Sequence, residues 1–454
     1  MRTILPAKFA QKIPQEVWDI FRIFKEAGYE IYLVGGGVRN LLSGKVPVNC
    51  DFTTNAKPEE IQKLLPDSFY NNVFGTVALV VKKGKKEEKY EITTYRGERG
   101  YTDHRRPDKV WWGKSLEEDL RRRESTINSM AIGENNKKYE LIDIFNGQED
   151  LKNKIWKAVG DPNERYFEDA LRMLRAIRFA SQFGFIIEPA TFAAIQKNSQ
   201  LINQISKERA KEELFKILAS GYPTEGVTLL MTSGLLQHII PELLKGYGMT
   251  QKGHHIYDVW THSVQSLKHC SSENPIVRLA TLIHDIGKPY VVRGEGEART
   301  FYNHEMVSAK IATNLADRLK FSKLEKEKLI TLVRWHQFTC DERQTDSAIR
   351  RFIKNVGKEN LQDMLDLRVG DRLGGGAKET SWRLEEFKKR LLEVQKQPFT
   401  VADLKVDGHD VMKILSLKPG PEVGQVLNQL FGKVVEGKLK NQKRVLLKEI
   451  KSLS

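Results

Sequence analysis

The chain has 454 residues, too many for one ordinary hydrophobic core, so roughly two to four domains are expected. Its 74 lysines and arginines exceed its 59 aspartates and glutamates, and the net charge of +15 favours nucleic acid over membrane as a partner. Three scattered cysteines exclude a disulfide framework and a CxxC zinc site, which fits a reducing cytoplasm, and no apolar run predicts a signal peptide or a membrane span.

The first predicted elements are a helix over residues 13–27 and a strand over residues 31–34, followed by three glycines at 35–37. Glycine lets backbone N–H groups approach an anion closely, and the helix that starts next presents an N-terminus that favours phosphate. Arg39 adds positive charge there, and a second strand carries Asp51. A phosphate cradle followed by a carboxylate suits a nucleoside triphosphate with Mg²⁺, although a glycine run alone also fits a tight turn without ligand.

Two more strands are predicted at residues 76–82 and 90–94, so strands with interspersed helices indicate a small mixed α/β head. Glu91, in the second of these strands, is the best candidate for a further carboxylate. Residues 95–107 then form a polar, basic loop, for which a solvated hairpin is the alternative interpretation.

A helix is predicted over residues 164–179. At 100° per residue its charged side chains lie round one half of the helix and its apolar ones on the other. Composition alone favours an ordinary amphipathic helix with surface arginines. Residues 182–247 continue as apolar-periodic helices with interspersed lysine and arginine, a pattern that suits contacts with RNA phosphates.

Seven of the ten histidines lie between residues 254 and 336, where an apolar helix is predicted to end at His284 and Asp285. Imidazole nitrogens and carboxylate oxygens suit Ni, Mn, Co or Mg, whereas one His-Asp dipeptide is more often a buried hydrogen-bonded pair. A linker at 374–378 and a charged helix at 382–397 follow. The last segment, residues 401–453, is either an RNA-binding tail or a plain helical cap.

The string from Gly35 to Asp51 resembles the G-G-x-V-R-D … D-x-D signature of class II tRNA nucleotidyltransferases and bacterial poly(A) polymerases, which belong to the polymerase-β-like superfamily. Residues 116–132 resemble the family's R-R-D-x-T-I-N-A-M-A segment, residues 168–179 resemble its base-recognition helix, and residues 417–424 resemble its K-P-G-P-x-I-G tail. The resemblance implies an α+β chain with a nucleotidyltransferase head, mixed sheet and helices, before mostly helical parts. The expected divisions are a head at 1–150, a neck and body at 151–250, an HD domain at 251–378 and a tail at 379–454.

The resemblance also implies the roles of individual residues in the head. Mg²⁺ would be held by Asn49 and Asp51, with Glu91 as a further catalytic carboxylate. Nucleotide binding would involve the residues Gly35, Gly36, Arg39, Arg122, Arg123, Asp169, Arg172, Arg175 and Arg178. Of these, Asp169 and Arg172 would hydrogen-bond the base edge of the incoming CTP or ATP.

Three positions depart from the family signature. Asn49 stands in place of the first aspartate of D-x-D, Asn40 in place of the aspartate of V-R-D, and Glu124 in place of the aspartate of R-R-D. Asparagine offers a carbonyl oxygen to a cation but no charge. The head is therefore expected to be slow, to recruit another acid, or to bind nucleotide with little turnover.

The histidine-rich region resembles the HD superfamily of metal-dependent phosphohydrolases, whose pattern is H … HD … D. The resemblance implies a divalent metal, Ni, Mn, Co or Mg, held by the six residues His262, His284, Asp285, His304, His336 and Asp371.

The function that the resemblance implies is template-independent addition or repair of the 3′-terminal CCA of tRNA in the cytoplasm. The partners would be the acceptor end of tRNA, CTP and ATP. Three alternatives stay open: a poly(A) polymerase, an HD phosphohydrolase whose head only binds nucleotide, and a tRNA-binding protein without catalysis.

Overall fold

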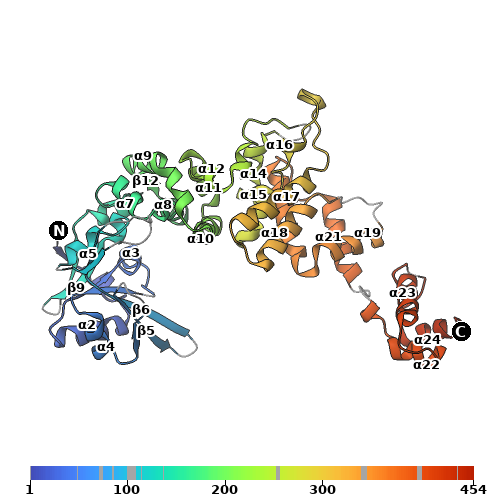
Figure 1. The fold of residues 1–454 in the computed structure, drawn as a ribbon, viewed down its shortest axis with the longest axis horizontal. Coiled ribbons are helices and arrows are strands. Elements are labelled where there is room, and N and C mark those ends of the chain that lie inside the picture. Colours follow the sequence, from blue (N-terminus) through green and yellow to red (C-terminus); the bar gives the residue numbers. More distant parts are fainter. Residues whose placement is uncertain are drawn as a thin grey trace. The chain divides into compact units, whose positions relative to one another are not determined.

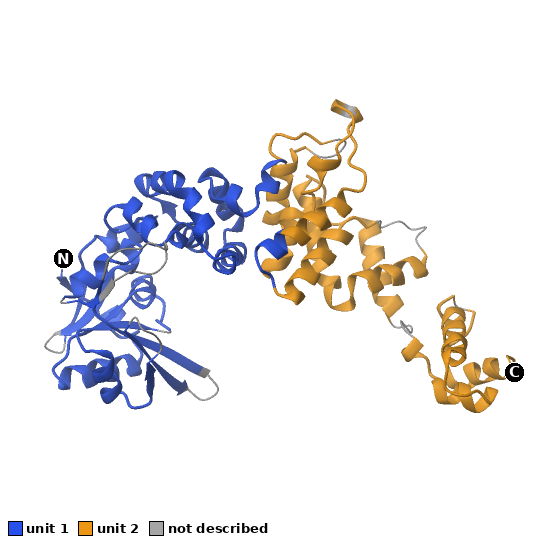
Figure 2. Cartoon of the chain, in the orientation of Figure 1, with its two compact units in different colours: residues 1–245, 315–321 blue, residues 246–314, 322–454 orange. Residues whose placement is uncertain are grey.

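The structure is a computed structural model that describes residues 2–48, 50–70, 75–83, 86–99, 109–113, 115–135, 138–251, 256–338, 345–395, 401–436 and 438–453. The chain forms two compact units (Figure 2). Unit 1 contains residues 1–245 and 315–321, and unit 2 contains residues 246–314 and 322–454.

Unit 1 begins with a mixed sheet of eight strands in the order β1-β10-β9-β2-β3-β6-β5-β4 (Figure 1). Its strands are β1 (Arg2–Ile4), β2 (Ile31–Val34), β3 (Asp51–Thr54), β4 (Ser68–Tyr70), β5 (Thr76–Lys83), β6 (Lys86–Thr94), β9 (Met130–Asn135) and β10 (Lys138–Asp143). Strands β3 and β6 are parallel, whereas the other neighbours are antiparallel. The sheet contains the strands predicted at 31–34, 76–82 and 90–94.

Alternating apolar residues cover both faces of this sheet. In β2, Leu33 packs into one core with the helix α2 (Gln15–Glu26), as the helical pattern over residues 13–27 predicts. The next residue, Val34, packs on the opposite face against α5 (Leu116–Arg121). With both faces buried, the end of β2 is held firmly, and this is where the glycine run begins.

Smaller β elements and helices complete unit 1. Strand β7 (Arg96–Arg99) pairs antiparallel with β8 (Lys109–Trp112), and β11 (Ile155–Trp156) pairs with β12 (Ile186–Ile187). Residues 100–107 of the predicted basic loop lie outside the described residues. The remaining α-helices are α1 (Ala7–Ala10), α3 (Gly36–Leu42), α4 (Pro58–Leu64), α6 (Gly147–Lys152), α7 (Pro162–Glu168), α8 (Leu171–Phe183), α9 (Pro189–Asn198), α10 (Lys207–Leu218), α11 (Pro223–Thr232), α12 (Leu236–Ile239) and α13 (Pro241–Leu244).

One predicted helix is wrong. Residues 164–179 form two helices, α7 and α8, because Asp169 leaves the helical conformation at φ −142° and ψ 102°. Its carboxylate accepts a hydrogen bond from the Leu171 backbone N–H at 3.1 Å and so caps the start of α8. Asp169 therefore does not share a helical arc with the arginines that follow it.

Unit 2 is helical. Its α-helices are α14 (Val259–Lys268), α15 (Pro275–Ile283), α16 (Lys288–Val291), α17 (His304–Arg318, whose last residues belong to unit 1), α18 (Lys323–Trp335), α19 (Asp346–Val356), α20 (Leu361–Gly374), α21 (Trp382–Gln395), α22 (Gly408–Leu415), α23 (Pro421–Val435) and α24 (Lys443–Lys451). The last three pack around their own small apolar core, which includes Val411, Leu430 and Leu446. Within the described ranges, no helix has the length and apolar character to cross a membrane.

Candidate active site and metal centre

The backbone of the glycine run lies beside two charged side chains, those of Arg123 and Asp51. Gly35 connects β2 to α3 with φ of 68°, a left-handed conformation that favours glycine. A Cβ atom built at Gly35 would lie 3.2 Å from Arg123 Nη1 and 3.4 Å from Asp51 Oδ2. The Gly35 backbone, the Arg123 guanidinium and the Asp51 carboxylate therefore lie close together. The sequence predicts each of these three groups separately.

Asp51 and Glu91 lie opposite each other on the parallel strands β3 and β6. Residues in register project from the same face of a sheet, so the second carboxylate lies beside the first. Burial raises the pKa of Asp51 to about 6, with Arg123 lowering it and Glu91 raising it. A divalent cation would stabilise the ionised form of a buried carboxylate that lies next to another acid. Carboxylate oxygens are donors that fit Mg²⁺. Asn49 lies outside the described residues.

Arg122 and Arg123 are both fixed by one buried acid, Asp119. Arg122 donates to Asp119 Oδ1 at 2.6 Å through Nη2, and Arg123 Nη2 donates to Asp119 Oδ2 at 3.2 Å. Burial opposes the charge of Asp119, but the two arginines outweigh it and lower its pKa. Asp119 was not predicted as a site residue, although its spacing of three and four residues from the arginines on one helical turn was a usable signal.

Arg39 is buried, and its side chain connects three elements. Its Nη1 donates to Asn128 Oδ1 at 2.7 Å, and its guanidinium lies 4.8 Å from the ring centre of Phe183 on α8. Burial lowers the pKa of Arg39 to about 10. Gly36 lies next to it, because a Cβ there would be 3.4 Å from Arg39 Nη2. Arg39 thus packs between Asn128 and Phe183. Its binding of phosphate stays a prediction.

Asp169 and Arg172 each form an ion pair with another residue of unit 1. Arg209 Nη2 donates to Asp169 Oδ2 at 3.0 Å, and Arg172 Nη1 donates to Glu168 Oε2 at 2.5 Å. Arg172 also donates through Nη2 to the backbone oxygen of Arg122 at 3.2 Å. Arg172, predicted to read the base, therefore lies directly beside Arg122, predicted to hold the triphosphate.

The two later arginines of α8 form ion pairs inside unit 1. Arg175 pairs with Glu124 through Nε and Nη2. Arg178 is buried and pairs with Glu213, at 3.2 Å between Nη1 and Oε1. The interpretation of Arg178 as a surface arginine is wrong, because α10 supplies the acid that allows its burial.

In unit 2, six residues from five parts of the chain converge on one buried cluster. Asp285 lies at the centre: its Oδ2 is 3.2 Å from His284 Nε2 and 3.4 Å from His262 Nε2, and its Oδ1 is 3.0 Å from His304 Nε2 and 3.6 Å from His336 Nε2. Asp371 Oδ1, from α20, lies 3.2 Å from His262 Nε2. All six predicted ligands are thus brought together.

The other ring nitrogen of three histidines faces a backbone carbonyl. Nδ1 of His284, His304 and His336 lies 2.7, 2.8 and 2.7 Å from the carbonyl oxygen three residues before it. A carbonyl only accepts, so Nδ1 carries the proton in the neutral ring and Nε2 presents its lone pair to the cluster. This is the tautomer that a metal requires.

Two overlapping groups of three donors share Asp285. His262, His284 and Asp285 form one and Asp285, His304 and His336 the other, each with ligand atoms within 4.8 Å of one another. Lys288 Nζ lies 2.5 Å from Asp285 Oδ2, a contact that was not predicted from the sequence. Burial opposes the charge of Asp285, but His284 and Lys288 outweigh it and hold its pKa well below the ordinary value. Imidazole and carboxylate donors of this kind fit a divalent transition metal.

Three family models match consecutive parts of the chain. The poly A polymerase head domain matches residues 31–157, the RNA- and SrmB-binding site of polymerase A matches residues 184–246, and tRNA nucleotidyltransferase domain 2 matches residues 298–450. The CCA-adding enzyme of Levilactobacillus brevis is 32% identical over 98% of each chain. That of Limosilactobacillus reuteri is 32% identical over 99% of this chain and 98% of its own.

This chain belongs to the family of CCA-adding enzymes. It is therefore a nucleotidyltransferase, as the signature from Gly35 to Asp51 predicts.

Solved CCA-adding enzymes share the architecture of the whole chain. The Bacillus stearothermophilus enzyme in complex with CTP is 26% identical, with a TM-score of 0.69 over 99% of this chain and 98% of the other. The Thermotoga maritima enzyme complexed with tRNA, at 20% identity and a TM-score of 0.64, shares the fold. The predicted α+β fold with a polymerase-β-like head is confirmed. The HD resemblance in unit 2 stays a prediction.

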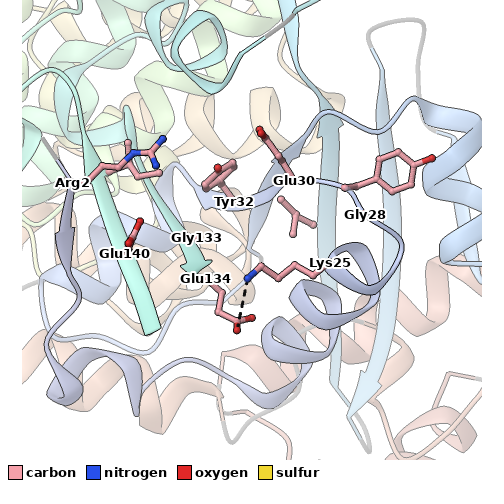
Figure 3. A pocket seen from close by; sticks show the side chains of 11 residues that line it. Arg2, Lys25, Gly28, Glu30, Tyr32, Gly133, Glu134 and Glu140 are labelled. Carbon is pink, nitrogen blue, oxygen red and sulfur yellow. Dashed lines mark ion pairs between the residues drawn. The ribbon is translucent and has the colours of Figure 1, made fainter. Parts of the chain in front are cut away.

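Figure 3 shows a pocket in the head of this CCA-adding family member. Its volume is about 370 Å³. It includes Ile31 and so lies at the end of β2 remote from Gly35. Arg2 and Lys25 face three lining acids there, and Lys25 Nζ lies 3.8 Å from Glu134 Oε1. With more negative than positive lining groups, this hollow does not suit a triphosphate.

The partly buried pair of Glu124 and Arg175 predicts a pH-dependent stability of unit 1. Burial opposes the charge of Glu124, but Arg175 outweighs it and lowers its pKa from 4.5 to about 2. The folded-state pKa is depressed, so the stabilisation is complete above pH 4.5 and is lost as pH falls toward 2. A shift of this size corresponds to about 3 kcal/mol.

The opening free energy of α8, measured by hydrogen exchange between pH 5 and pH 3 and corrected for intrinsic rates, tests this prediction. It is expected to fall more steeply for the natural protein than for Glu124→Gln, whose amide does not titrate. Parallel pH profiles for the two proteins would contradict it.

Proposed function

We propose that this chain adds the 3′-terminal CCA of tRNA in the cytoplasm, using CTP and ATP as donors and Mg²⁺ in the head. The observation that carries the proposal is the approach of the Gly35 backbone, Asp51 and Arg123 to one another, with Glu91 in register beside Asp51. These groups supply a phosphate cradle, a cationic clamp and acidic donors in one place.

In this proposal the residues of the head bind Mg²⁺ and the triphosphate and position them for the reaction. Asp51 and Glu91 would hold Mg²⁺, which would neutralise phosphate charge and orient the triphosphate. Arg122 and Arg123 hold phosphate oxygens, since Asp119 keeps both guanidinium groups in place. The oxygen of the tRNA 3′-hydroxyl then forms a bond to the α-phosphorus, its proton passes to solvent, and the bond from the α-phosphorus to pyrophosphate breaks.

Base selection belongs to Asp169 and Arg172. A carboxylate accepts from the exocyclic amine that cytosine and adenine share, and a guanidinium donates to ring nitrogen or carbonyl oxygen. Within the protein, Asp169 accepts from Arg209 and Arg172 donates to Glu168. The incoming base would therefore take the place of Arg209 at Asp169 and of Glu168 at Arg172. Only a base that replaces both ion pairs would be bound.

Asn49 provides a direct test of the proposal. Asn49→Asp is expected to raise the rate of CTP and ATP addition to tRNA that lacks its 3′ end, because it restores the charge that a second metal donor needs. The measurement is incorporation of labelled nucleotide, and sequencing of the extended ends separates CCA addition from poly(A) synthesis. An active Asn49→Asp protein beside a silent natural one would instead favour a head that only binds nucleotide.

A second candidate function is supported by the cluster in unit 2. Four imidazole Nε2 atoms and two carboxylates converge, which fits a divalent metal that activates water for attack on phosphorus. We propose a phosphohydrolase activity of the HD type at this cluster. Release of phosphate from a phosphomonoester in the presence of Ni²⁺ or Mn²⁺ tests it independently of nucleotide addition.

A further inference from the structure

A lysine on strand β6 contacts one of the proposed Mg²⁺ ligands directly. Lys89 Nζ donates to Glu91 Oε1 at 2.5 Å. Alternate residues of a strand project from the same face, so Lys89 and Glu91 share one face of the sheet, whereas Tyr90 between them is buried in the core on the other face. Lys89 therefore projects from the face that carries the candidate metal site. It belongs to none of the segments that resemble the family signatures.

The register of three strands places Lys89 on the same side as the glycine run. Val34 lies opposite Asp51, and Asp51 lies opposite Glu91, so these residues form a row across β2, β3 and β6. Strand β2 is antiparallel to β3, and β3 is parallel to β6, so the chain after Val34 and the chain before Glu91 leave this row on the same side. Gly35 follows Val34, and Lys89 lies about 7 Å along the strand from Glu91. The lysine thus lies on the side of the row where the triphosphate is proposed to bind.

The charge of Lys89 acts on both acids, but its ion pair is weak. Burial raises the pKa of Asp51, Arg123 lowers it, Glu91 raises it and Lys89 lowers it. The side chains of Lys89 and Glu91 are 45% and 38% exposed, and exposed ion pairs contribute little to stability. Lys89 would therefore leave Glu91 at low cost once that carboxylate is held by a divalent cation, which carries twice the charge of an ammonium.

The departure at Asn49 indicates where the ammonium is needed. Asn49, like Lys89, stands two residues before a proposed Mg²⁺ ligand, and its amide brings no charge to hold a second metal ion. In two-metal sites the ions stabilise both the attacking and the leaving oxygen. A head with one acid fewer therefore lacks positive charge beside the leaving pyrophosphate. A lysine supplies that charge to phosphate as a flexible point cation.

We propose that Lys89 takes the place of a second metal ion: with Mg²⁺ held by Asp51 and Glu91, the Lys89 ammonium binds the β- and γ-phosphates of the nucleotide and stabilises the pyrophosphate as it leaves. The inference rests on the proposed nucleotide addition and names a further residue of that site. Lys89 donates hydrogen bonds and transfers no proton, so the bonds that form and break in the reaction are unchanged.

Isothermal titration calorimetry without tRNA tests binding, since no nucleotide is added under that condition. The probes are CTP, inorganic pyrophosphate and CMP, each with Mg²⁺. Lys89→Gln is expected to weaken the binding of CTP and pyrophosphate by at least about 10-fold, because a charge-assisted hydrogen bond is lost, and to leave that of CMP unchanged. Lys89→Arg keeps the charge and is expected to restore most of the affinity.

Lys63→Gln is the matched control. Lys63 is an exposed lysine of α4, and Ile61 of the same helix packs into the core on the face of the sheet opposite Glu91. The substitution removes the same charge from the head and is expected to change no affinity.

Nucleotide addition supplies a second arm, as a double-variant cycle with Asn49→Asp. The loss of rate caused by Lys89→Gln is expected to be several-fold smaller in the Asn49→Asp protein than in the natural one, because the restored acid helps to hold a second metal ion that neutralises the same phosphates. A lysine that only stabilised β6 would lower the rate by the same factor in both proteins.

Three results would overturn the inference: unchanged affinity for CTP and pyrophosphate in Lys89→Gln, an equal loss of affinity for CMP, or the same loss of rate with and without Asn49→Asp. Each leaves the proposed nucleotide addition standing, because addition by the natural protein is measured separately. Conversely, a natural protein that adds no nucleotide would overturn the proposed addition, while calorimetry would still show whether Lys89 binds phosphate.

Discussion

Asp51→Asn is expected to lower nucleotide addition by about 10²–10³-fold, the size of effect that loss of a group stabilising transition-state charge produces. Asp51 contributes its charge beside Gly35 and Arg123, where the triphosphate is proposed to bind. The asparagine keeps the shape of the side chain but cannot neutralise a cation. The rate of CTP incorporation into tRNA lacking its 3′ end is the measurement.

The same variant is expected to fold at least as stably as the natural protein. Burial raises the pKa of Asp51 to about 6, so its charge at neutral pH is unfavourable for folding and an amide removes that penalty. A melting temperature that is equal or higher, together with lost activity, distinguishes a catalytic role from a structural one. Asp67→Asn, at an exposed position of the head, is the control and should change neither quantity. Full activity in Asp51→Asn would contradict the proposed metal site.

Asp285→Asn is expected to abolish metal binding in unit 2. Asp285 touches four imidazoles and Lys288, so its loss removes the donor that both groups of ligands share. It also leaves the buried ammonium of Lys288 without that carboxylate, which is expected to cost about 3–5 kcal/mol of stability. Elemental analysis of the purified protein and denaturant unfolding are the measurements.

A paired variant separates the two effects of Asp285. Asp285→Asn with Lys288→Met removes the uncompensated charge, so part of the stability should return while metal stays absent. Addition of CTP and ATP to tRNA should be unchanged in both proteins, because Asp285 lies in unit 2 and the proposed transferase residues lie in unit 1. Metal retained by Asp285→Asn would contradict the ligand assignment.

Local patterns predicted the head well. The run Ile31–Val34 forms β2, the glycines mark the turn into α3, and Asp51 starts the next strand. These features depend on neighbours in the chain: alternation of side chains along a strand, and the backbone freedom of glycine at φ 68°. Glu91, named from the sequence only as the best further acid, proved to lie in register with Asp51.

The sequence by itself therefore determined the family, the head with its strands and glycine turn, and the identity of the residues that meet at Asp51 and Asp285. Only the tertiary structure decided which charges are committed to distant partners, such as Arg178 against Glu213 and Arg175 against Glu124. It also broke the helix at Asp169, which pairs with Arg209, forty residues along the chain. Periodicity reports local conformation, but the cost of burying a charge is met by groups distant in sequence, and no pattern within one segment contains them.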